Sequence, residues 1–259
     1  MIRVNGYELT QENFPDGTLR LSMPETDYSC MVDIEWRYEN DAELFTLICA
    51  RRYFEDMPVM LYLPYIPHAR QDRVKQPTDV FTLKYFCEVI NSLNFCTVVV
   101  DDAHSNVALA LLDRIAQFDT TTHIEEAIND YCDENTVLFF PDEGSMKRYS
   151  DNIKLPYSFG IKKRDWQTGK ILGYTIADEE VVKGKRVLII DDICSRGGTF
   201  FHAARALKDA GATAIGLYVT HCENTILEGE IFSSGLIEKI YTTKSLVHKP
   251  ELAERVEYV

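Results

Sequence analysis

Residues 187–200, VLIIDDICSRGGTF, lead from a continuous apolar run through two aspartates into a loop with two adjacent glycines. An uninterrupted apolar run is typical of a strand buried on both faces of a parallel sheet. Adjacent glycines permit a tight loop whose backbone N–H groups point at one spot, and the helix expected from Thr199 adds the positive end of its dipole. The stretch therefore predicts an anion cradle at the carboxyl end of a buried strand.

Apolar runs elsewhere in the chain alternate with stretches that have helical spacing. This strand–helix–strand order predicts an α/β fold with mainly parallel sheets. The 259 residues are enough for two medium-sized domains. The expected buried strands are 59–64, 96–101, 137–140, 186–191 and 214–219.

One sequence pattern occurs twice. VVVDDAHS at 98–105 and LIIDDICS at 188–195 share three apolar residues, Asp-Asp, two variable positions and Ser. We interpret them as equivalent parts of two α/β halves, each with carboxylates at the carboxyl end of a strand, where such sheets bind ligands. This predicts an N-terminal domain over 1–135 and a C-terminal domain over 136–259, whose last segment is free to pack back on the first domain.

Composition excludes several classes of protein. The formal net charge of −14 opposes binding to a nucleic-acid backbone. The chain has no apolar run of about 18 residues or more, as a membrane span requires, and no secretory signal pattern. Seven scattered cysteines without a C-x-x-C pair favour reduced thiols. We therefore expect a cytoplasmic protein with no nucleic-acid or membrane partner.

The chemistry of 191–199 narrows the ligand. The carboxylates of Asp191 and Asp192 suit a vicinal diol, or Mg²⁺ through its water shell. A loop of Gly-Gly type at a helix N-terminus suits a phosphate. A diol together with a phosphate indicates a ribose phosphate; the alternative is an ordinary strand–loop–helix turn with exposed aspartates. The loop consists of Ser195, Arg196, Gly197, Gly198 and Thr199.

The same stretch resembles the phosphoribosyl-diphosphate (PRPP) motif of type I phosphoribosyltransferases and of PRPP synthetases. Further segments resemble PRPP synthetases, and ordinary type I transferases lack the first half altogether. These segments are FPDG (14–17), LPYIPHARQDRV (63–74), DDAHS (101–105), PDEGSMKR (141–148) and IKKRD (161–165), in family order. The resemblance identifies a relative of the ribose-phosphate diphosphokinases and implies two tandem domains like those of type I phosphoribosyltransferases.

The resemblance also implies roles for individual residues. Asp191 and Asp192 would hold the ribose hydroxyls, and the loop 195–199 would hold the 5′-phosphate. Mg²⁺ would be the cofactor, bound largely through waters. The catalytic residues would be Lys162 and Arg164; the ATP site would use Phe14, Asp16, Arg70, Gln71 and Asp72; the metal site would use Asp102, His104 and Asp142.

In the family the loop at 14–17 comes from a neighbouring subunit, which implies a homo-oligomer built from dimers, such as a hexamer. The implied reaction is attack by the anomeric hydroxyl of ribose 5-phosphate on the β-phosphorus of ATP, which gives PRPP and AMP. Lys162 and Arg164, among glycines 160, 169 and 173, would form a mobile lid over the transferred group.

Two alternatives stay open. The family usually has a carboxylate and a threonine where this loop has Ser195 and Arg196, so positive charge is gained. Arginine pairs with phosphates bidentately, which suits a 5′-diphosphate such as that of ADP-ribose. The loop resembles a phage-type branch linked to NAD salvage, whose acceptor is ADP-ribose and whose product is ADP-ribose 1-diphosphate. The other alternative is a non-catalytic PRPP-binding or regulatory protein.

Overall fold

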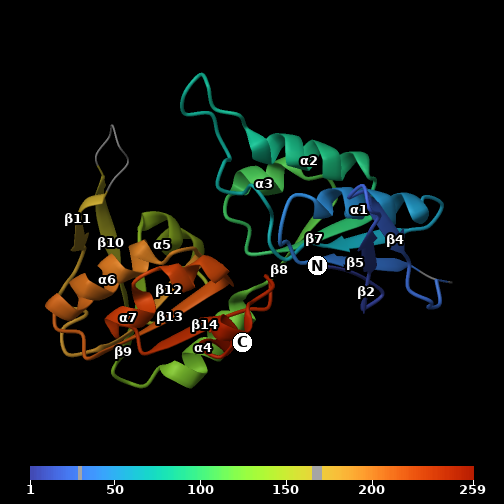
Figure 1. Ribbon diagram of the computed structural model, residues 1–259. Helices are drawn as coiled ribbons and strands as arrows, with labels where there is room; N and C mark the ends of the chain where they lie inside the picture. Colours follow the sequence, from blue (N-terminus) through green and yellow to red (C-terminus); the bar gives the residue numbers. More distant parts are fainter. Residues whose placement is uncertain (29–30, 165–170) are drawn as a thin grey trace. The chain divides into compact units, whose positions relative to one another are not determined.

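The computed structural model describes residues 1–28, 31–164 and 171–259; for residues 162–164 and 171–172 it describes only the backbone (Figure 1). The chain divides into two compact units. The first comprises Met1–Asp119 with Ser245–Val247, and the second comprises Thr120–Lys244 with His248–Val259. Each contains a sheet with packed helices.

The first unit is built on a six-stranded sheet in the order β2-β1-β5-β6-β7-β8. Strands β5 to β8 are mutually parallel, and β1 and β2 extend one edge in the antiparallel sense. A separate hairpin pairs β3 with β4. The elements are β1 (Ile2–Val4), β2 (Tyr7–Glu8), β3 (Thr10–Asn13), β4 (Leu19–Ser22), β5 (Val32–Trp36), α1 (Glu43–Tyr53), β6 (Val59–Tyr62), α2 (Thr82–Ser92), β7 (Thr97–Asp101), α3 (Asn106–Leu111) and β8 (Ile115–Phe118).

The second unit has a seven-stranded sheet in the order β11-β10-β9-β12-β13-β14-β15, parallel except for the β10–β11 pair. Its strands are β9 (Thr136–Phe140), β10 (Tyr157–Arg164), β11 (Ile171–Ile176), β12 (Arg186–Cys194), β13 (Ala214–Cys222), β14 (Lys239–Thr242) and β15 (Glu257–Tyr258). Its helices are α4 (Thr121–Tyr131), α5 (Glu143–Tyr149), α6 (Gly198–Asp209), the 3₁₀ turn η1 (Asn224–Glu228), α7 (Ile231–Ser234) and α8 (Pro250–Ala253).

Strand β12 is buried on both faces, as its apolar run predicts. Val187 and Ile189 join the core that includes Phe200 of α6, whereas Leu188 and Ile190 join the core on the opposite face. The five expected strands are all present, and the predicted α/β class with mainly parallel sheets is confirmed.

Helix α4 belongs to the second unit, although the expected boundary at 135/136 assigns it to the first domain. Ile124, Ala127 and Tyr131 pack into the same core as Leu138 of β9, and this core lies within the second unit. At the end of the chain, β15 pairs in parallel with β14, so these residues extend the sheet of the second unit.

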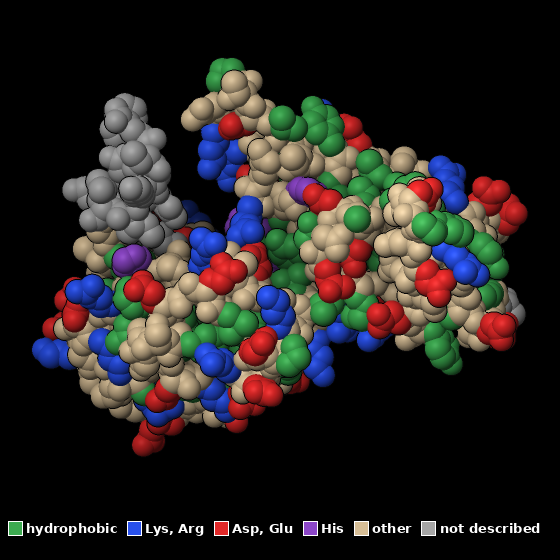
Figure 2. All heavy atoms as spheres, in the orientation of Figure 1, with side chains coloured by type: hydrophobic (Ala, Val, Ile, Leu, Met, Phe, Trp, Pro, Cys, Tyr) green, Lys and Arg blue, Asp and Glu red, His purple; other side chains and the backbone are tan. Residues whose placement is uncertain are grey.

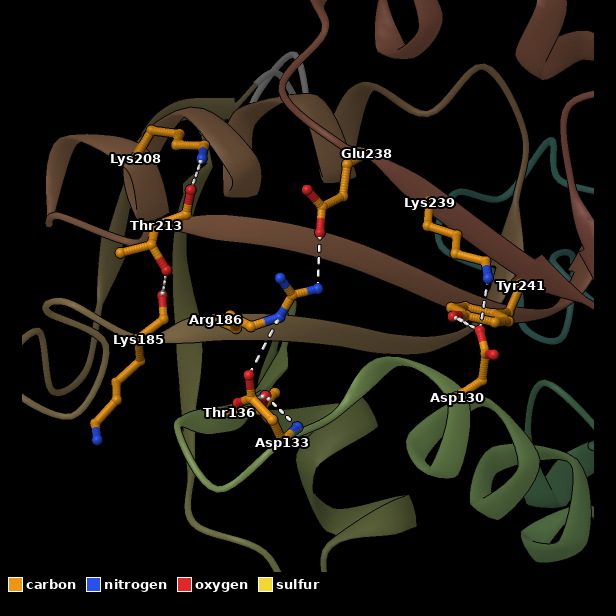
Figure 3. A network of polar contacts seen from close by, with 10 residues as sticks. All are labelled: Asp130, Asp133, Thr136, Lys185, Arg186, Lys208, Thr213, Glu238, Lys239 and Tyr241. Atoms are coloured by element: carbon orange, nitrogen blue, oxygen red, sulfur yellow. Dashed lines mark hydrogen bonds and ion pairs between the residues drawn. The ribbon is translucent and has the colours of Figure 1, made fainter.

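A network of polar contacts ties together the amino ends of β12 and β14 and the segment around α4 (Figure 3). Arg186 Nη2 lies 2.9 Å from Glu238 Oε1, and Arg186 Nε lies 4.0 Å from Asp133 Oδ2. Lys239 Nζ lies 2.6 Å from Asp130 Oδ2, which also accepts a hydrogen bond from the Tyr241 hydroxyl. These side chains occupy the end of the sheet opposite to the one where β12 leads into the glycine loop.

On the face that Figure 2 shows, basic and acidic side chains are interspersed over the second unit. Among the described helices, none combines the length and the apolar character that crossing a membrane requires.

Candidate active site

The glycine loop of the second unit joins β12 to α6. Gly197 is the N-cap residue of α6 and has φ +76°, a left-handed conformation that favours glycine. A Cβ on Gly197 would lie 2.1 Å from Ile231 Cδ1, whereas a Cβ on Gly198 would meet nothing within 4 Å. The loop is therefore tightly packed at Gly197 and open at Gly198, where α6 begins, one residue before the expected start at Thr199. An open helix N-terminus with exposed N–H groups can hold a phosphate.

Asp191 and Asp192 fall within β12, near its carboxyl end. Successive side chains of a strand point to opposite faces, so the two carboxylates leave the sheet on different sides. Asp192 is 5% exposed, and its Oδ2 accepts a hydrogen bond from Arg148 Nη1 of α5 at 2.8 Å. Asp191 is half-buried and lies on the other face, near Tyr174. The pair is thus two differently placed carboxylates, one of which is part of a partly buried ion pair.

Residues Ser195 and Arg196 are held by the segment that follows β13. Ser195 Oγ lies 3.2 Å from Thr225 Oγ1. Arg196 Nη2 lies 3.0 Å from Glu228 Oε2, and the two side chains are 73% and 58% exposed. The positive charge that Arg196 brings to the loop is therefore partnered by a carboxylate within the unit.

Asp142, an expected metal-site residue, is the N-cap of α5. Its Oδ1 accepts hydrogen bonds from the backbone N–H groups of Gly144, at 3.0 Å, and Ser145, at 3.1 Å. The preceding carbonyl, that of Pro141, accepts a hydrogen bond from the Tyr174 hydroxyl at 2.9 Å. Burial raises the pKa of Tyr174, and the nearby Asp142 and Asp191 raise it further.

The expected catalytic residues Lys162 and Arg164 are on β10. Lys162 pairs with Tyr174, and Arg164 with Ile171, on the neighbouring strand β11. Their side chains, and residues 165–170 of the expected lid, lie outside the described residues. The backbone places both positions at the end of the β10–β11 hairpin where the two strands are joined.

In the first unit, two sequence motifs meet beside Asp72. This residue is 6% exposed, and its Oδ1 accepts a hydrogen bond from Arg73 Nε at 2.8 Å. Burial opposes the charged form, but the hydrogen bond from Arg73 and the nearby His104 together hold the pKa of Asp72 below its ordinary value. The 63–74 and 101–105 segments, far apart in sequence, therefore form one local site.

Strand β7 ends at Asp101 and leads into the 101–105 segment of this site. Asp101 is buried, and its Oδ2 accepts a hydrogen bond from the Tyr62 hydroxyl at 2.7 Å. Burial and this carboxylate raise the pKa of Tyr62. Asp102 follows with φ +35°, which is uncommon for a residue other than glycine, and is 2% exposed. Arg70 and Gln71 are exposed beside the site.

Phe14 and Asp16 occupy the loop between β3 and β4. Phe14 is 50% exposed, so its ring is available for stacking. Asp16 Oδ1 accepts hydrogen bonds from the Thr18 backbone N–H at 3.0 Å and from its hydroxyl at 2.7 Å, and these bonds lower the pKa of Asp16. Gly17 has φ +84°, so the turn needs glycine there.

The expected site residues thus fall into two groups. Asp142, Asp191, Asp192 and the loop 195–199 belong to the second unit, and the expected ATP-side residues belong to the first. The expected metal residues are divided between the units, and the described residues contain no group of three or more side chains suited to hold a metal ion. The oxygen donors present suit a hard cation such as Mg²⁺ bound through waters.

Arg148, Tyr174 and Thr225 take part in the site although sequence reasoning assigned them no role. Arg148 lies in the PDEGSMKR segment, six residues after Asp142, so the motif contained a signal for it. Tyr174 and Thr225 stand in no motif, because their contacts depend on how the strands and loops come together.

Comparison with known proteins agrees with this architecture. Residues 115–231 match the family model described as "Phosphoribosyl transferase domain". The chain is 27% identical over 262 residues to "Ribose-phosphate pyrophosphokinase" of Chlorobaculum tepidum, covering 96% of this chain and 79% of the relative. It is 29% identical over 238 residues to "Ribose-phosphate pyrophosphokinase 2" of Archaeoglobus fulgidus, covering 89% of this chain and 82% of the relative.

The fold is similar to that of a crystal structure of phosphoribosylpyrophosphate synthetase from Mycobacterium smegmatis. The TM-score is 0.77 at 18% identity, over 97% of this chain and 85% of that chain. The sequence relatives span both units, and the family model matches most of the second unit up to α7. Over nearly its whole length, the chain is therefore similar to the ribose-phosphate pyrophosphokinases.

Proposed function

We propose that this enzyme transfers the β,γ-diphosphate of ATP to the anomeric hydroxyl of ribose 5-phosphate, which gives PRPP and AMP. The observation that supports this most is the carboxyl end of β12, where two carboxylates precede a packed glycine loop and an open helix N-terminus. This site occurs in a chain whose relatives across both units are named ribose-phosphate pyrophosphokinases.

In the second unit, the ribose phosphate would bind over the 195–199 loop. The N–H groups at the start of α6 suit its 5′-phosphate, and Gly198 leaves room for close approach. Asp191 would accept hydrogen bonds from the ribose hydroxyls. Asp192 would also do so, with Arg148 holding its carboxylate in place. Arg148 is thus a positioning residue in this proposal.

In the first unit, ATP would bind beside Asp72. Arg70 and Gln71 are exposed there and suit the phosphate chain and the base. Phe14 and Asp16, on an exposed hairpin, would contact the adenine of a neighbouring subunit, and on this basis we propose a homo-oligomer built from dimers. We also propose that the enzyme is cytoplasmic and serves nucleotide biosynthesis.

Mg²⁺ is the proposed cofactor and would offset the charge of the phosphate chain. We propose that Asp102, His104 and Asp142 bind Mg²⁺, either directly or through its water ligands. Lys162 and Arg164 would stabilise the charge that develops on the transferred group, since such transfers depend on positioning and charge neutralisation.

The contact of Arg196 bears on the acceptor. Because Glu228 already balances its charge, the loop has less need of a second phosphate, and this favours ribose 5-phosphate. The ion pair is exposed, however, and such pairs contribute only about 0–1 kcal/mol, so a ligand diphosphate would readily displace Glu228. The same chemistry on ADP-ribose, within NAD salvage, is therefore the second candidate.

The test is AMP formation from ATP and Mg²⁺, measured in parallel with ribose 5-phosphate and with ADP-ribose. We expect AMP with ribose 5-phosphate, a loss of at least about 100-fold in kcat for Lys162→Ala, and little change for the adjacent Lys163→Ala. AMP with ADP-ribose alone would transfer the proposal to the second candidate. AMP with neither acceptor would overturn it and favour a non-catalytic PRPP-binding or regulatory protein.

A further inference from the structure

The first unit contains a cavity of about 340 Å³, and the residues assigned to ATP are not among those that line it. Ligand pockets have volumes of roughly 300–1,000 Å³, so this one has room for a one- or two-ring molecule. Its walls come from β5, α1 and α2, and the segment that contains His68 closes one side. The walls are mainly apolar and include Trp36, Leu44, Phe86 and Val89.

The aromatic walls are held in fixed positions. Trp36 is 1% exposed, and its Nε1–H donates to Glu43 Oε2 at 2.9 Å. Its ring centroid lies 6.0 Å from that of Phe86, which in turn lies 5.6 Å from the His68 ring. Because indole and phenyl rings are locked by packing and a buried hydrogen bond, the cavity is preformed and suits a flat ring.

Asp41 contributes a carboxylate to the lining. Asp41 Oδ1 accepts a hydrogen bond from the Tyr38 hydroxyl at 2.9 Å and lies 3.2 Å from His68 Nε2. Among the contacts of the described residues, Asp41 Oδ2 has no partner and remains an acceptor at the entrance, where Asp41 is 70% exposed. Within the part of the chain that the structure describes, no Lys or Arg lines this cavity. This charge favours a ligand with N–H donors and disfavours a phosphate.

We propose that this cavity binds a planar, phosphate-free aromatic ring with N–H donors, of the kind found in free nucleobases. The ring would lie among Trp36, Phe86 and Val89, with its N–H groups on Asp41. The shape of the cavity suits a flat ring, and the Asp41 carboxylate suits an N–H donor on that ring.

Two lining residues also hold Gln71, and this part of the inference rests on the proposed function. The Gln71 backbone N–H donates to the His68 carbonyl at 2.9 Å, and Thr82 Oγ1 donates to Gln71 Oε1 at 2.9 Å. His68 has φ +63°, an uncommon conformation for a residue other than glycine. A ring that moves His68 would move Gln71, and would change KM for ATP more than kcat.

The test uses the full-length chain with Trp166→Phe, which leaves Trp36 as the single tryptophan. Adenine is the probe, and AMP is the charged comparator. We expect saturable quenching of Trp36 fluorescence by adenine, at least tenfold weaker binding of AMP, and at least tenfold weaker adenine binding after Val89→Phe, which fills the cavity. Asp41→Asn should weaken adenine binding about fivefold or more, because a charge-assisted hydrogen bond is lost.

Phe14→Ala is the control for the proposed adenine site and should leave the Trp36 signal unchanged. The proposal is overturned if adenine gives no saturable signal up to its solubility limit, or if Val89→Phe and Asp41→Asn both bind it as the parent does. Since the Trp36 signal requires no catalysis, loss of this binding and loss of the proposed activity are observed separately.

Discussion

Arg148→Ala tests whether Arg148 holds Asp192 in the site. Arg148 Nη1 and Asp192 Oδ2 are 2.8 Å apart, and the side chains are 29% and 7% exposed. Removal of one partner from a buried pair costs about 3–5 kcal/mol, and part of this is recovered here because Arg148 is partly solvated. Protonation of the Asp192 carboxylate limits the loss, since it costs about 4 kcal/mol at pH 7. We therefore expect a loss of about 2–4 kcal/mol.

The assay is hydrogen exchange of the peptides that cover α5 and β12, measured under conditions where the rate reports the opening equilibrium. A loss of 2–4 kcal/mol corresponds to a fall in protection of about 30- to 1,000-fold. At pH 5 the effect should shrink, because protonation of the carboxylate then costs only about 1.5 kcal/mol.

Lys147→Ala is the matched control, on the same helix and one residue away. Lys147 Nζ lies 2.7 Å from Glu143 Oε1, but both side chains are more than 60% exposed, at 69% and 66%. Such an i,i+4 pair contributes about 0.3–0.5 kcal/mol. Equal effects of Arg148→Ala and Lys147→Ala, or an effect that does not depend on pH, would refute the reasoning.

Three further predictions follow from the second unit. Gly160→Ala should lower the free energy of unfolding by about 1–3 kcal/mol, measured by urea titration, because the new Cβ would lie 2.1 Å from the Tyr174 hydroxyl oxygen; unchanged stability would contradict it. Hydrogen bonds from Lys239 and Tyr241 lower the pKa of Asp130, so the stability that they confer is lost as the pH falls through that depressed pKa. In Asp130→Asn, the midpoint of urea unfolding should therefore fall less on acidification than in the parent. An unchanged dependence of the midpoint on pH would contradict this prediction. Arg196→Ala should change the free energy of unfolding by less than about 0.5 kcal/mol, because its ion pair is exposed. In the AMP assay, the same variant should raise KM for ADP-ribose more than KM for ribose 5-phosphate. Equal changes in the two KM values would argue against a role of Arg196 in the choice of acceptor.

The parallel sheets were predictable because buried strands leave a plain signal. The apolar runs at 137–140 and 186–191 became β9 and β12, with both faces covered. Strand β5 was not predicted, because Asp33 and Glu35 interrupt its apolar residues; it is buried only at alternate positions. Local composition detects a strand buried on both faces more easily than one buried on one face.

The site was predictable to the level of loops and motifs but not of contacts. The glycine loop and the start of α6 agree with the sequence within one residue. The ion pair between Arg148 and Asp192 joins positions 44 apart, and no local pattern encodes it. The contact of Arg196 with Glu228, 32 residues away, is of the same kind. Such pairs depend on how helices and strands meet in space.

The most direct test of the proposed reaction is the identity of the products, read by ³¹P NMR after incubation of the enzyme with ATP, Mg²⁺ and ribose 5-phosphate. Transfer of the intact diphosphate predicts AMP together with a diphosphate on the anomeric carbon of the ribose, formed in equal amounts. ADP together with a ribose bisphosphate would show transfer of a single phosphoryl group and would contradict the account.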